Sequence, residues 1–317
     1  MSFLKRLFGH PPVPEWASFL KPEQFDRFIS LVERELRRLG FAFQTDRSAG
    51  VIAARKEGRQ DSHQLGLTNL AQRCAQTSEA DWPDVVAKHV GALVSIESSQ
   101  TFLESLKNDF EKARELLKIR IYDAAALAEM PEGSHVYWRP ADGIVAALTF
   151  DLPTTVATVS SDHVEAWGRE PEELFRIGLE NVRATRLQAE EVAVDEEVRI
   201  TVLEAEAEDF FTATRALVLE DYLDPIPELG AIVAIPHREA LLVYPIRDSS
   251  VLPAIQSLLP ITLGMYDEGP GSISPHLFWW HRGELTCLPA AVEGDTIEFQ
   301  PPREFVDGVL SRVVEST

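Results

Sequence analysis

Two short clusters of ionisable side chains contain residue types that could carry out acid–base chemistry. The first holds Asp162, His163 and Glu165 just before Trp167, and the second is His237-Arg238-Glu239. A histidine beside carboxylates can exchange protons near neutral pH, and a neighbouring arginine can bind an anion. Each cluster also has a structural interpretation, and the surrounding residues favour it.

The residues around the first cluster predict a short helix. Ser161 is of the type preferred at an N-cap, and Asp162 and Glu165 then lie in the first turn, near the positive helix end. Gly168 supplies the stop. His163 is the one residue left for chemistry, and a lone histidine beside first-turn acids is usually a solvated or core-edge side chain.

The second cluster lies at a turn between two predicted strands. It could form an acid–base or anion site, but polar turn chemistry, with Arg238 paired to a carboxylate, is the favoured interpretation. Asp151 precedes Leu152-Pro153 at a strand end, a place where α/β enzymes often hold catalytic acids. No partner for Asp151 is evident in the sequence, so a turn-forming role is favoured.

A late segment combines two histidines with adjacent tryptophans. His276 and His281 are five positions apart on a predicted strand, so they point to opposite faces and do not share a metal. Trp279 and Trp280 also face opposite sides; one can be core, and the other is either covered by a helix layer or exposed as an interface anchor. The candidate binding residues are Trp279, Trp280, His276, His237, Arg238 and Asp151.

The familiar catalytic motifs are missing from the sequence. It contains no GxxxxGK[ST], GxGxxG, HExxH or GxSxG pattern. The two cysteines, Cys74 and Cys287, are far apart and form no CxxC, which disfavours a thiolate metal site and fits a reducing compartment. The sequence therefore predicts no catalytic residue, no metal site and no cofactor.

Charge is distributed unevenly along the chain. The net charge is −21, and it arises from a nearly balanced stretch at 1–120 and a strongly acidic stretch at 121–317. No lysine follows Lys118. Such a field repels phosphate backbones, so nucleic-acid binding is disfavoured, whereas a basic protein partner would be attracted. The plainer interpretation is that the charge maintains solubility.

Hydrophobic periodicity and turn residues predict an α+β fold, with antiparallel or mixed sheets carrying packed helices in two to three subdomains. We expect a loosely ordered segment at 1–20, an α+β domain at 21–112 and an acidic α+β domain at 113–317, with a subdivision near 188. Helices are expected at 22–39, 69–78, 82–94, 98–110, 161–167, 171–182, 249–263 (broken by Pro260) and 301–315. Strands are expected at 41–46, 51–56, 63–68, 116–123, 135–139, 143–151, 154–160 and 196–207. Hairpins are expected to turn at 236–238 and at Arg282-Gly283.

One stretch resembles an uncharacterised bacterial family catalogued as domain of unknown function 1444. The stretch is LTFDLPTTVATVSSDHVEAWGREPEELFRIGLENV, and LGLTNLAQR, LLKIRIYD, IVAIPHREALLVYP and ISPHLFWWHRGEL fit in the same order. The resemblance covers roughly residues 20–290. It departs at Pro236-His237-Arg238-Glu239, where the family tends to show Asp in the last position. It implies no activity and transfers no catalytic residue.

These features favour a cytoplasmic, non-enzymatic protein-binding or scaffold module. Its partner would contact the acidic surface or the tryptophan strand. Two alternatives stay open: a hydrolase-like enzyme with a non-standard site, and a small-ligand sensor with a pocket between the sheet and its helices. No membrane span is expected; residues 3–8 alternate apolar and basic side chains, which allows weak membrane-surface contact. The sequence does not determine the oligomeric state.

Overall fold

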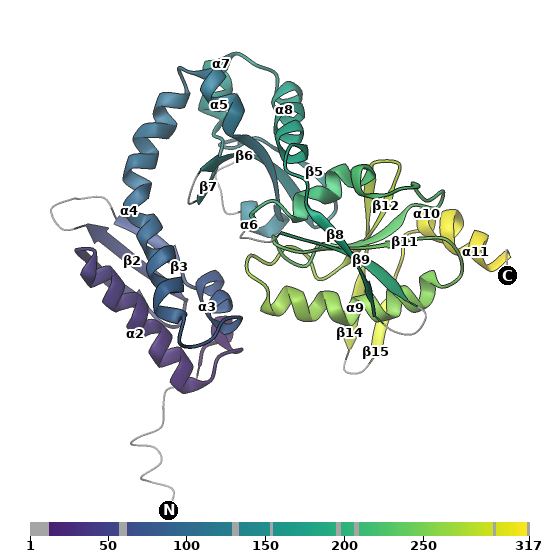
Figure 1. Ribbon diagram of the computed structural model, residues 1–317, viewed down its shortest axis with the longest axis horizontal. Coiled ribbons are helices and arrows are strands. Elements are labelled where there is room, and N and C mark those ends of the chain that lie inside the picture. The colour runs from purple at the N-terminus through teal and green to yellow at the C-terminus, as the bar shows by residue number, and fades with distance from the viewer. Residues whose placement is uncertain are drawn as a thin grey trace, which may run out of the picture. The chain divides into compact units, whose positions relative to one another are not determined.

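The chain folds into two compact units, Met1–Phe102 and Leu103–Thr317. The computed structural model describes residues 13–56, 62–128, 133–152, 155–194, 198–205, 209–293 and 296–315 (Figure 1). Helices and antiparallel sheets occur in both units, so the predicted α+β fold class is confirmed. The predicted boundary between residues 112 and 113 falls inside helix α5 (Phe110–Leu116), and the subdivision near 188 falls at the start of strand β8 (Gln188–Ala193). The predicted membrane contact by residues 3–8 lies outside the described residues.

The first unit is a helix packed on a three-stranded antiparallel sheet. Helix α2 (Pro22–Arg38) buries the apolar stripe that the sequence predicts, including Phe25, Phe28 and Leu36. The sheet has the order β1-β2-β3, with β1 at Phe41–Asp46, β2 at Val51–Lys56 and β3 at Ser62–Gly66. The short elements η1 (Glu15–Ala17) and α3 (Thr68–Ala75) complete this unit together with most of α4.

The predicted division of residues 82–110 into two helices is wrong. A single helix, α4, runs from Trp82 to Leu106. Ser98 looked like a helix start, but serine is also tolerated within a helix, and no proline or glycine lies between Val94 and Ser98 to stop the first helix. The next true start is Asp109, whose side chain accepts a hydrogen bond from the Lys112 backbone N–H at 3.1 Å and caps α5.

The second unit begins with a four-stranded antiparallel sheet. Its long strand β6 (Ile144–Leu152) pairs with β4 (Leu117–Asp123), β5 (Tyr137–Ala141) and β7 (Thr155–Thr158). Helices α5 and α8 (Pro171–Arg183) pack against it, and α8 lies along β4 (Figure 1). The short helices α6 (Ala124–Ala128) and α7 (Ser161–Trp167) adjoin the strands. The N-cap of α7 is Ser160 rather than the predicted Ser161, because the helical hydrogen bonds begin one residue earlier.

A six-stranded antiparallel sheet forms the rest of the second unit. Its order is β13-β12-β10-β11-β9-β8. The strands after β8 are β9 (Arg199–Glu204), β10 (Ala231–Ala234), β11 (Leu241–Pro245), β12 (Leu277–His281) and β13 (Glu284–Leu288). The predicted hairpin turn at Arg282-Gly283 is confirmed: both residues have positive φ, of 53° and 85°, as a tight two-residue hairpin requires.

Both faces of the six-stranded sheet are covered. One packs against α9 (Val251–Glu268) and the C-terminal helical run of α10 (Arg303–Phe305), η3 (Val306–Leu310) and α11 (Ser311–Glu315). The other packs against η2 (Ala213–Tyr222) and residues of β4 and β6. A hairpin of β14 (Ala290–Glu293) and β15 (Thr296–Phe299), which the sequence analysis missed, follows β13.

The predicted break at Pro260 is absent, and α9 continues through it. Pro260 lies on the exposed side of the helix, whereas Leu258, Leu259 and Thr262 are buried against the sheet on both sides of it. Packing of this kind stabilises a helix despite the one backbone hydrogen bond that proline removes. The C-terminal helical run is irregular, since its middle segment, Val306–Leu310, is a π-helix.

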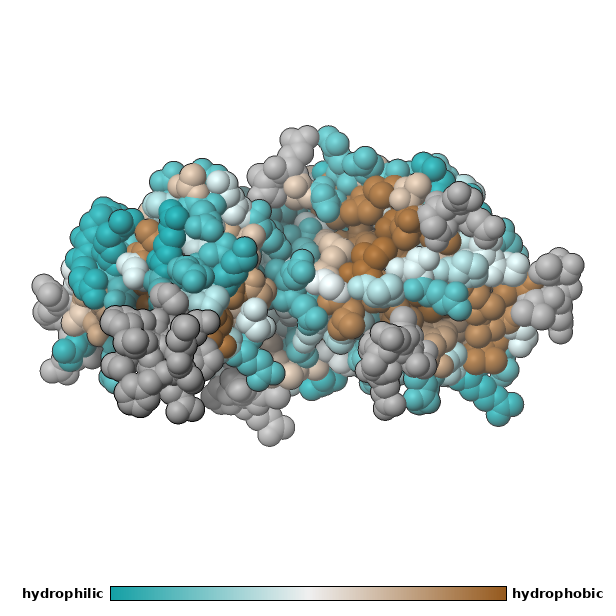
Figure 2. Space-filling view, turned by 90° about the horizontal axis from the view of Figure 1, so that it is seen from below, coloured by the Kyte–Doolittle hydropathy of each residue, from teal (hydrophilic) through white to brown (hydrophobic). Residues whose placement is uncertain are grey.

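Part of the surface of the second unit is apolar. Figure 2, the view from below Figure 1, shows apolar side chains gathered over this unit on the side where α9 lies. Leu252 at the start of α9 is an exposed large apolar residue. Despite this apolar surface, none of the helices within the described residues is both long and apolar enough to cross a membrane.

The close packing of α8 on β4 generates a stability prediction. A Cβ added at Gly178 would lie 2.9 Å from Ile119 Cδ1 and 3.2 Å from the Lys118 carbonyl carbon, whereas one added at Gly264 of α9 would meet nothing within 4 Å. We expect G178V to lower the free energy of unfolding by about 1–3 kcal/mol, as overpacked cores do. Chemical denaturation of the purified variants measures this.

The matched control is G264V, which we expect to change stability by less than about 0.5 kcal/mol, as exposed substitutions do. Equal stability of the two variants would show that α8 does not depend on this close approach.

Candidate functional site

His163, the histidine of the first predicted cluster, is a structural residue. It is buried; its Nδ1 lies 2.6 Å from Ser160 Oγ and its Nε2 lies 3.0 Å from the Leu103 carbonyl oxygen. Its ring contacts those of Phe150 and Trp167. The cluster is therefore a helix terminus packed on the core. Both ring nitrogens of His163 lie within hydrogen-bond distance of other groups of the protein.

Trp279 and Trp280 do not form an exposed surface. They point to opposite faces of the sheet, as predicted, but they are only 8% and 1% exposed. Trp279 donates from Nε1 to the Leu229 carbonyl at 2.8 Å, and its ring contacts Phe305 near the C-terminus. The alternative of a sheet covered on both faces is thus the one observed, and an exposed tryptophan anchor on β12 is wrong.

His237 and Arg238 are buried in the turn between β10 and β11. Arg238 Nε lies 3.2 Å from Glu239 Oε1, and His237 Nδ1 accepts a hydrogen bond from the Glu239 backbone N–H at 3.2 Å. Burial, with a smaller contribution from the charge of Arg238, lowers the pKa of His237 to about 4. His276 is partly buried, which lowers its pKa as well. These contacts match the predicted turn chemistry.

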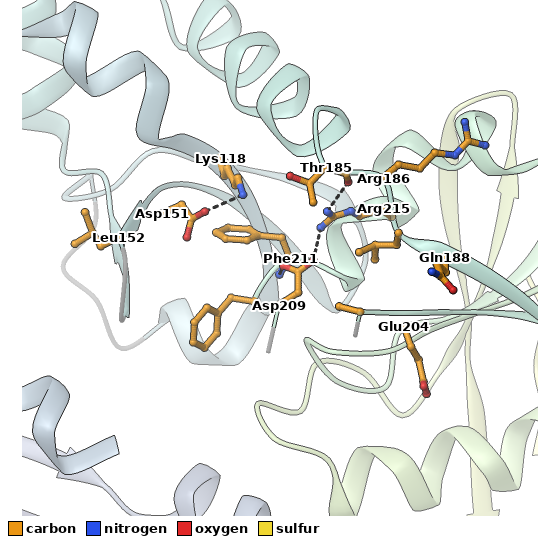
Figure 3. Close-up of a pocket in the computed structure, with 13 residues that line it drawn as sticks. Lys118, Asp151, Leu152, Thr185, Arg186, Gln188, Glu204, Asp209, Phe211 and Arg215 are labelled. Carbon is orange, nitrogen blue, oxygen red and sulfur yellow. Dashed lines mark hydrogen bonds and ion pairs between the residues drawn. The ribbon is translucent and has the colours of Figure 1, made fainter. Parts of the chain in front are cut away.

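Asp151 lines a pocket whose described lining includes none of the other candidate residues. The pocket has a volume of about 550 Å³ and lies between the two sheets of the second unit (Figure 3). Its walls come from strands β4, β6, β8 and β9, from the segment that joins α8 to β8, and from η2 with the segment that leads into it. The lining residues are Lys118, Asp151, Leu152, Thr185, Arg186, Leu187, Gln188, Glu204, Ala205, Asp209, Phe210, Phe211 and Arg215.

Arg215 is the most deeply buried charge in the pocket wall. Its side chain is 1% exposed; Nη2 donates to the Thr185 carbonyl at 3.0 Å, and Nη1 lies 3.1 Å from Asp209 Oδ2. Asp209 in turn accepts from the Phe211 backbone N–H at 2.8 Å. Within the described part of the chain, neither Nε nor Nη1 of Arg215 has a hydrogen-bond acceptor in good geometry. A buried guanidinium with unused donors marks a place where an acceptor is missing.

Lys118 supplies the second positive charge of the pocket. Its Nζ lies 2.8 Å from Asp151 Oδ2 and 4.7 Å from the centre of the Phe211 ring. An ion pair and a cation–π contact together hold the ammonium group in one place. The neighbouring Phe210 ring has the guanidinium groups of Arg120 and Arg238 at 5.6 and 5.1 Å from its centre.

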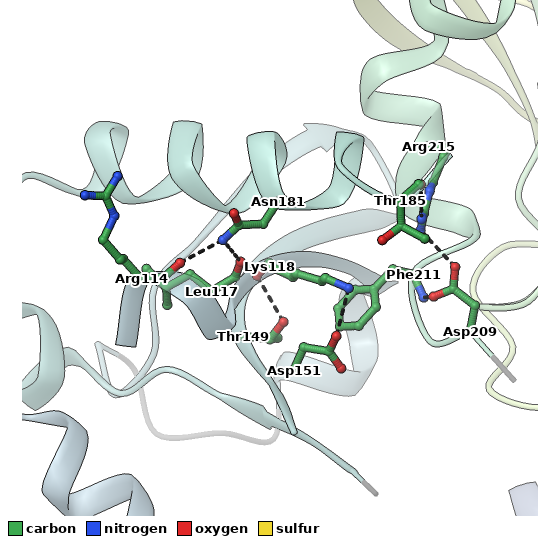
Figure 4. Close-up of polar contacts among 10 residues, drawn as sticks. All are labelled: Arg114, Leu117, Lys118, Thr149, Asp151, Asn181, Thr185, Asp209, Phe211 and Arg215. Atoms are coloured by element: carbon green, nitrogen blue, oxygen red, sulfur yellow. Dashed lines mark hydrogen bonds and ion pairs between the residues drawn. The ribbon is translucent and has the colours of Figure 1, made fainter. Parts of the chain in front are cut away.

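Hydrogen bonds from neighbouring elements position Lys118 (Figure 4). Asn181 of α8 donates from Nδ2 to the carbonyl oxygens of Arg114 and Leu117, both at 2.7 Å. Thr149 of β6 donates to the Lys118 carbonyl at 3.0 Å. The start of strand β4 is therefore fixed on both sides, which places Lys118 opposite Phe211.

The pocket contains groups suited to polar recognition. Its lining residues offer charged groups of both signs together with phenyl and leucine side chains. Two ion pairs, Lys118–Asp151 and Arg215–Asp209, form between lining residues. Among the described residues, no group of three or more histidine, cysteine or acidic side chains could hold a metal ion. Burial raises the pKa of the Cys74 and Cys287 thiols to about 12 and about 11, which keeps both protonated at neutral pH.

Lys118 and Arg215 were not predicted from the sequence. A signal for Lys118 was present, because Lys118, Arg120 and Tyr122 alternate with buried Leu117, Ile119 and Ile121 on one strand and must share a face. Arg215 had no such signal: it lies in ATRALVLE, among small and apolar residues, and its partners are distant in the chain.

The Arg215–Asp209 pair should be a large contributor to stability. We expect R215M and D209N each to lower the free energy of unfolding by about 3–5 kcal/mol, because each leaves a buried charge without its partner. The double variant should lose less than the sum, with a coupling energy of about 0.5–3 kcal/mol. The exposed Arg303–Asp307 pair is the control, in which no measurable coupling is expected. Additive losses at 209 and 215 would contradict the pairing.

Stability should also depend on pH through His237. Its pKa in the folded chain, about 4, is below the ordinary value of 6.5, so below pH 6.5 the unfolded chain takes up a proton that the folded chain does not. Stability is therefore lost from pH 6.5 down to pH 4, by about 3 kcal/mol in all at roughly 1.4 kcal/mol per pKa unit. The H237N variant should lose less stability over this range in urea titrations. If the free energy of unfolding fell equally with pH in both proteins, His237 would not be the source of this pH dependence.

Comparison of the chain with models of protein families, with curated proteins and with solved structures finds no match to any of them. The resemblance to domain of unknown function 1444 stays a prediction, and the geometry of the pocket carries the functional argument.

Proposed function

We propose that the protein binds a small polar molecule with an anionic group in the pocket between its two sheets. This corresponds to the small-ligand sensor among the alternatives that the sequence left open. One observation carries the proposal: Arg215 is buried in the pocket wall, and its Nε and Nη1 have no acceptor in good hydrogen-bond geometry among the described residues, although Nη1 forms an ion pair with Asp209.

The energetics of buried donors support a ligand at this point. A buried donor without a partner costs about 1–3 kcal/mol, and more when it is charged. Both nitrogens of Arg215 have almost no accessible surface, so a ligand oxygen would reach them once a neighbouring side chain of the wall moves aside, and that contact would recover the energy. Lys118 adds a second fixed positive charge, and an anion placed near both would be held by charge-assisted hydrogen bonds.

The size and composition of the pocket also support binding. Its volume of about 550 Å³ lies within the range of roughly 300–1,000 Å³ that small-molecule sites occupy. Apolar side chains from Leu152, Leu187 and the two phenylalanines stand beside the charged groups. A site of this kind can orient a ligand by its polar end and enclose the apolar remainder.

The two other functions have less support. For a protein-binding module, the tryptophan strand is not available, so that interpretation rests on the acidic surface and stays a prediction. For an enzyme, the residues suggested by the sequence were Asp151, His237, Arg238 and His276. Only Asp151 lines the pocket, and its carboxylate is paired with Lys118.

A ligand screen tests the proposed function. Differential scanning fluorimetry with a panel of carboxylates, phosphates, amino acids and neutral polyols should find at least one compound that raises the unfolding midpoint. The K118Q variant should bind that compound about 10- to 100-fold more weakly, since a hydrogen bond to a charged group is worth roughly 1.5–3 kcal/mol.

The control for this screen is R176Q, which removes an exposed cation on α8 outside the pocket lining. It should bind like the unaltered protein. A panel in which no compound shifts the midpoint, or a hit that K118Q and R176Q bind equally well, would count against the pocket as the binding site.

A further inference from the structure

We propose that the ligand is a small zwitterion, a molecule that carries both a carboxylate and an ammonium group, as an α-amino acid does. This inference rests on the proposed function and adds the chemical class of the ligand. It follows from the acceptor groups of the pocket, from its charge balance, and from the field of the chain around it.

The pocket has acceptors for an ammonium group as well as donors for a carboxylate. Asp151 is 34% exposed at the wall and uses Oδ2 for Lys118, and its Oδ1 has no partner among the described residues. Glu204 of β9 is exposed at the rim. A carboxylate offers about four acceptor sites, so Asp151 can accept from Lys118 and from a ligand ammonium group together.

The cations of the pocket are held more deeply than the acids that pair with them. Arg215 is 1% exposed against 16% for Asp209, and Lys118 is 18% exposed against 34% for Asp151. A ligand entering from solvent would therefore place its carboxylate toward the wall of Lys118 and Arg215. Its ammonium group would stay nearer the opening, beside Asp151.

The charges that line the pocket are balanced. The cations are Lys118, Arg186 and Arg215, and the acids are Asp151, Glu204 and Asp209. A ligand without net charge preserves this balance, whereas a dianion or a simple amine would bury a net charge, which is unfavourable without a further partner. Among ligands that contain the anionic group required by Arg215, a zwitterion meets this condition.

The field of the surrounding chain gives the same preference. The 317-residue protein has a net charge of −21, and residues 121–317 contain no lysine. Such a field lowers the local concentration of anions and slows their approach. A zwitterion has no net charge, so it reaches the pocket without this repulsion, and a phosphate ester does not.

The test uses the full-length protein and matched compounds. Each of the common L-α-amino acids is added in differential scanning fluorimetry, and the affinity of the best one is measured by isothermal titration calorimetry. Two analogues with the same side chain follow: the carboxylic acid without the amine, and the amine without the carboxylate. We expect each analogue to bind at least 10-fold more weakly than the amino acid.

A variant pair places the ammonium group in the pocket. D151N should weaken binding of the amino acid at least 10-fold, with a smaller effect on the carboxylic acid, because the lost charge faces the ammonium group. D307N, an exposed acid of the C-terminal helical run outside the pocket lining, should leave both affinities unchanged. The unfolding midpoint of D151N without ligand reports whether the variant is folded.

Each other outcome overturns the inference in a recognisable way. Equal affinity for the carboxylic acid would identify an anion site, and equal affinity for the amine would identify a cation site. If no amino acid binds but another compound in the wider screen does, the proposed function stands and the zwitterion is wrong. If nothing binds at all, the proposed function itself fails.

Discussion

The buried Arg215–Asp209 ion pair connects three segments of the second unit. Arg215 and Asp209 join the segment before η2 to η2 itself, and the bond from Arg215 to the Thr185 carbonyl connects both to the segment that leaves α8. These three parts of the chain also form a wall of the pocket. A charge this deeply buried is stable only when it is paired, so its partners must occupy fixed positions. The ion pair consequently fixes the shape of this wall of the pocket.

Interactions that stabilise the fold also prepare the pocket for a ligand. Lys118 is held by Asp151 and by the Phe211 ring, and its strand is held by Asn181 and Thr149. Preorganised groups lose little conformational entropy on binding, which favours affinity for a small molecule. The same arrangement leaves acceptors and donors that the protein does not use, at Asp151 and at Arg215. Structure and binding thus draw on the same side chains.

The sequence predicts those parts of the fold that depend on neighbouring residues. The stripe of Phe25, Phe28 and Leu36 on α2 and the turn at Arg282-Gly283 are local patterns, and both are confirmed. Where tertiary packing decides, prediction failed. Pro260 does not interrupt α9, because the sheet holds the helix on both sides of it.

The candidate site shows the same division between local and long-range information. Asp151 was identified because it lies at a strand end two residues before a proline, which is a local signal. Its partner Lys118 lies 33 positions earlier and meets it through the pairing of β4 with β6. Arg215 lies among apolar residues, and its role depends on a carbonyl 30 positions away. Contacts of this kind are set by topology, and a single sequence does not display them.

The most direct test of the account is a crystal structure of the full-length protein grown with the L-α-amino acid that stabilises it most. We predict electron density for the ligand in the pocket, with its carboxylate toward Lys118 and Arg215 and its ammonium group toward Asp151. Ligand density elsewhere on the protein, with the pocket holding only water, would contradict the central claim.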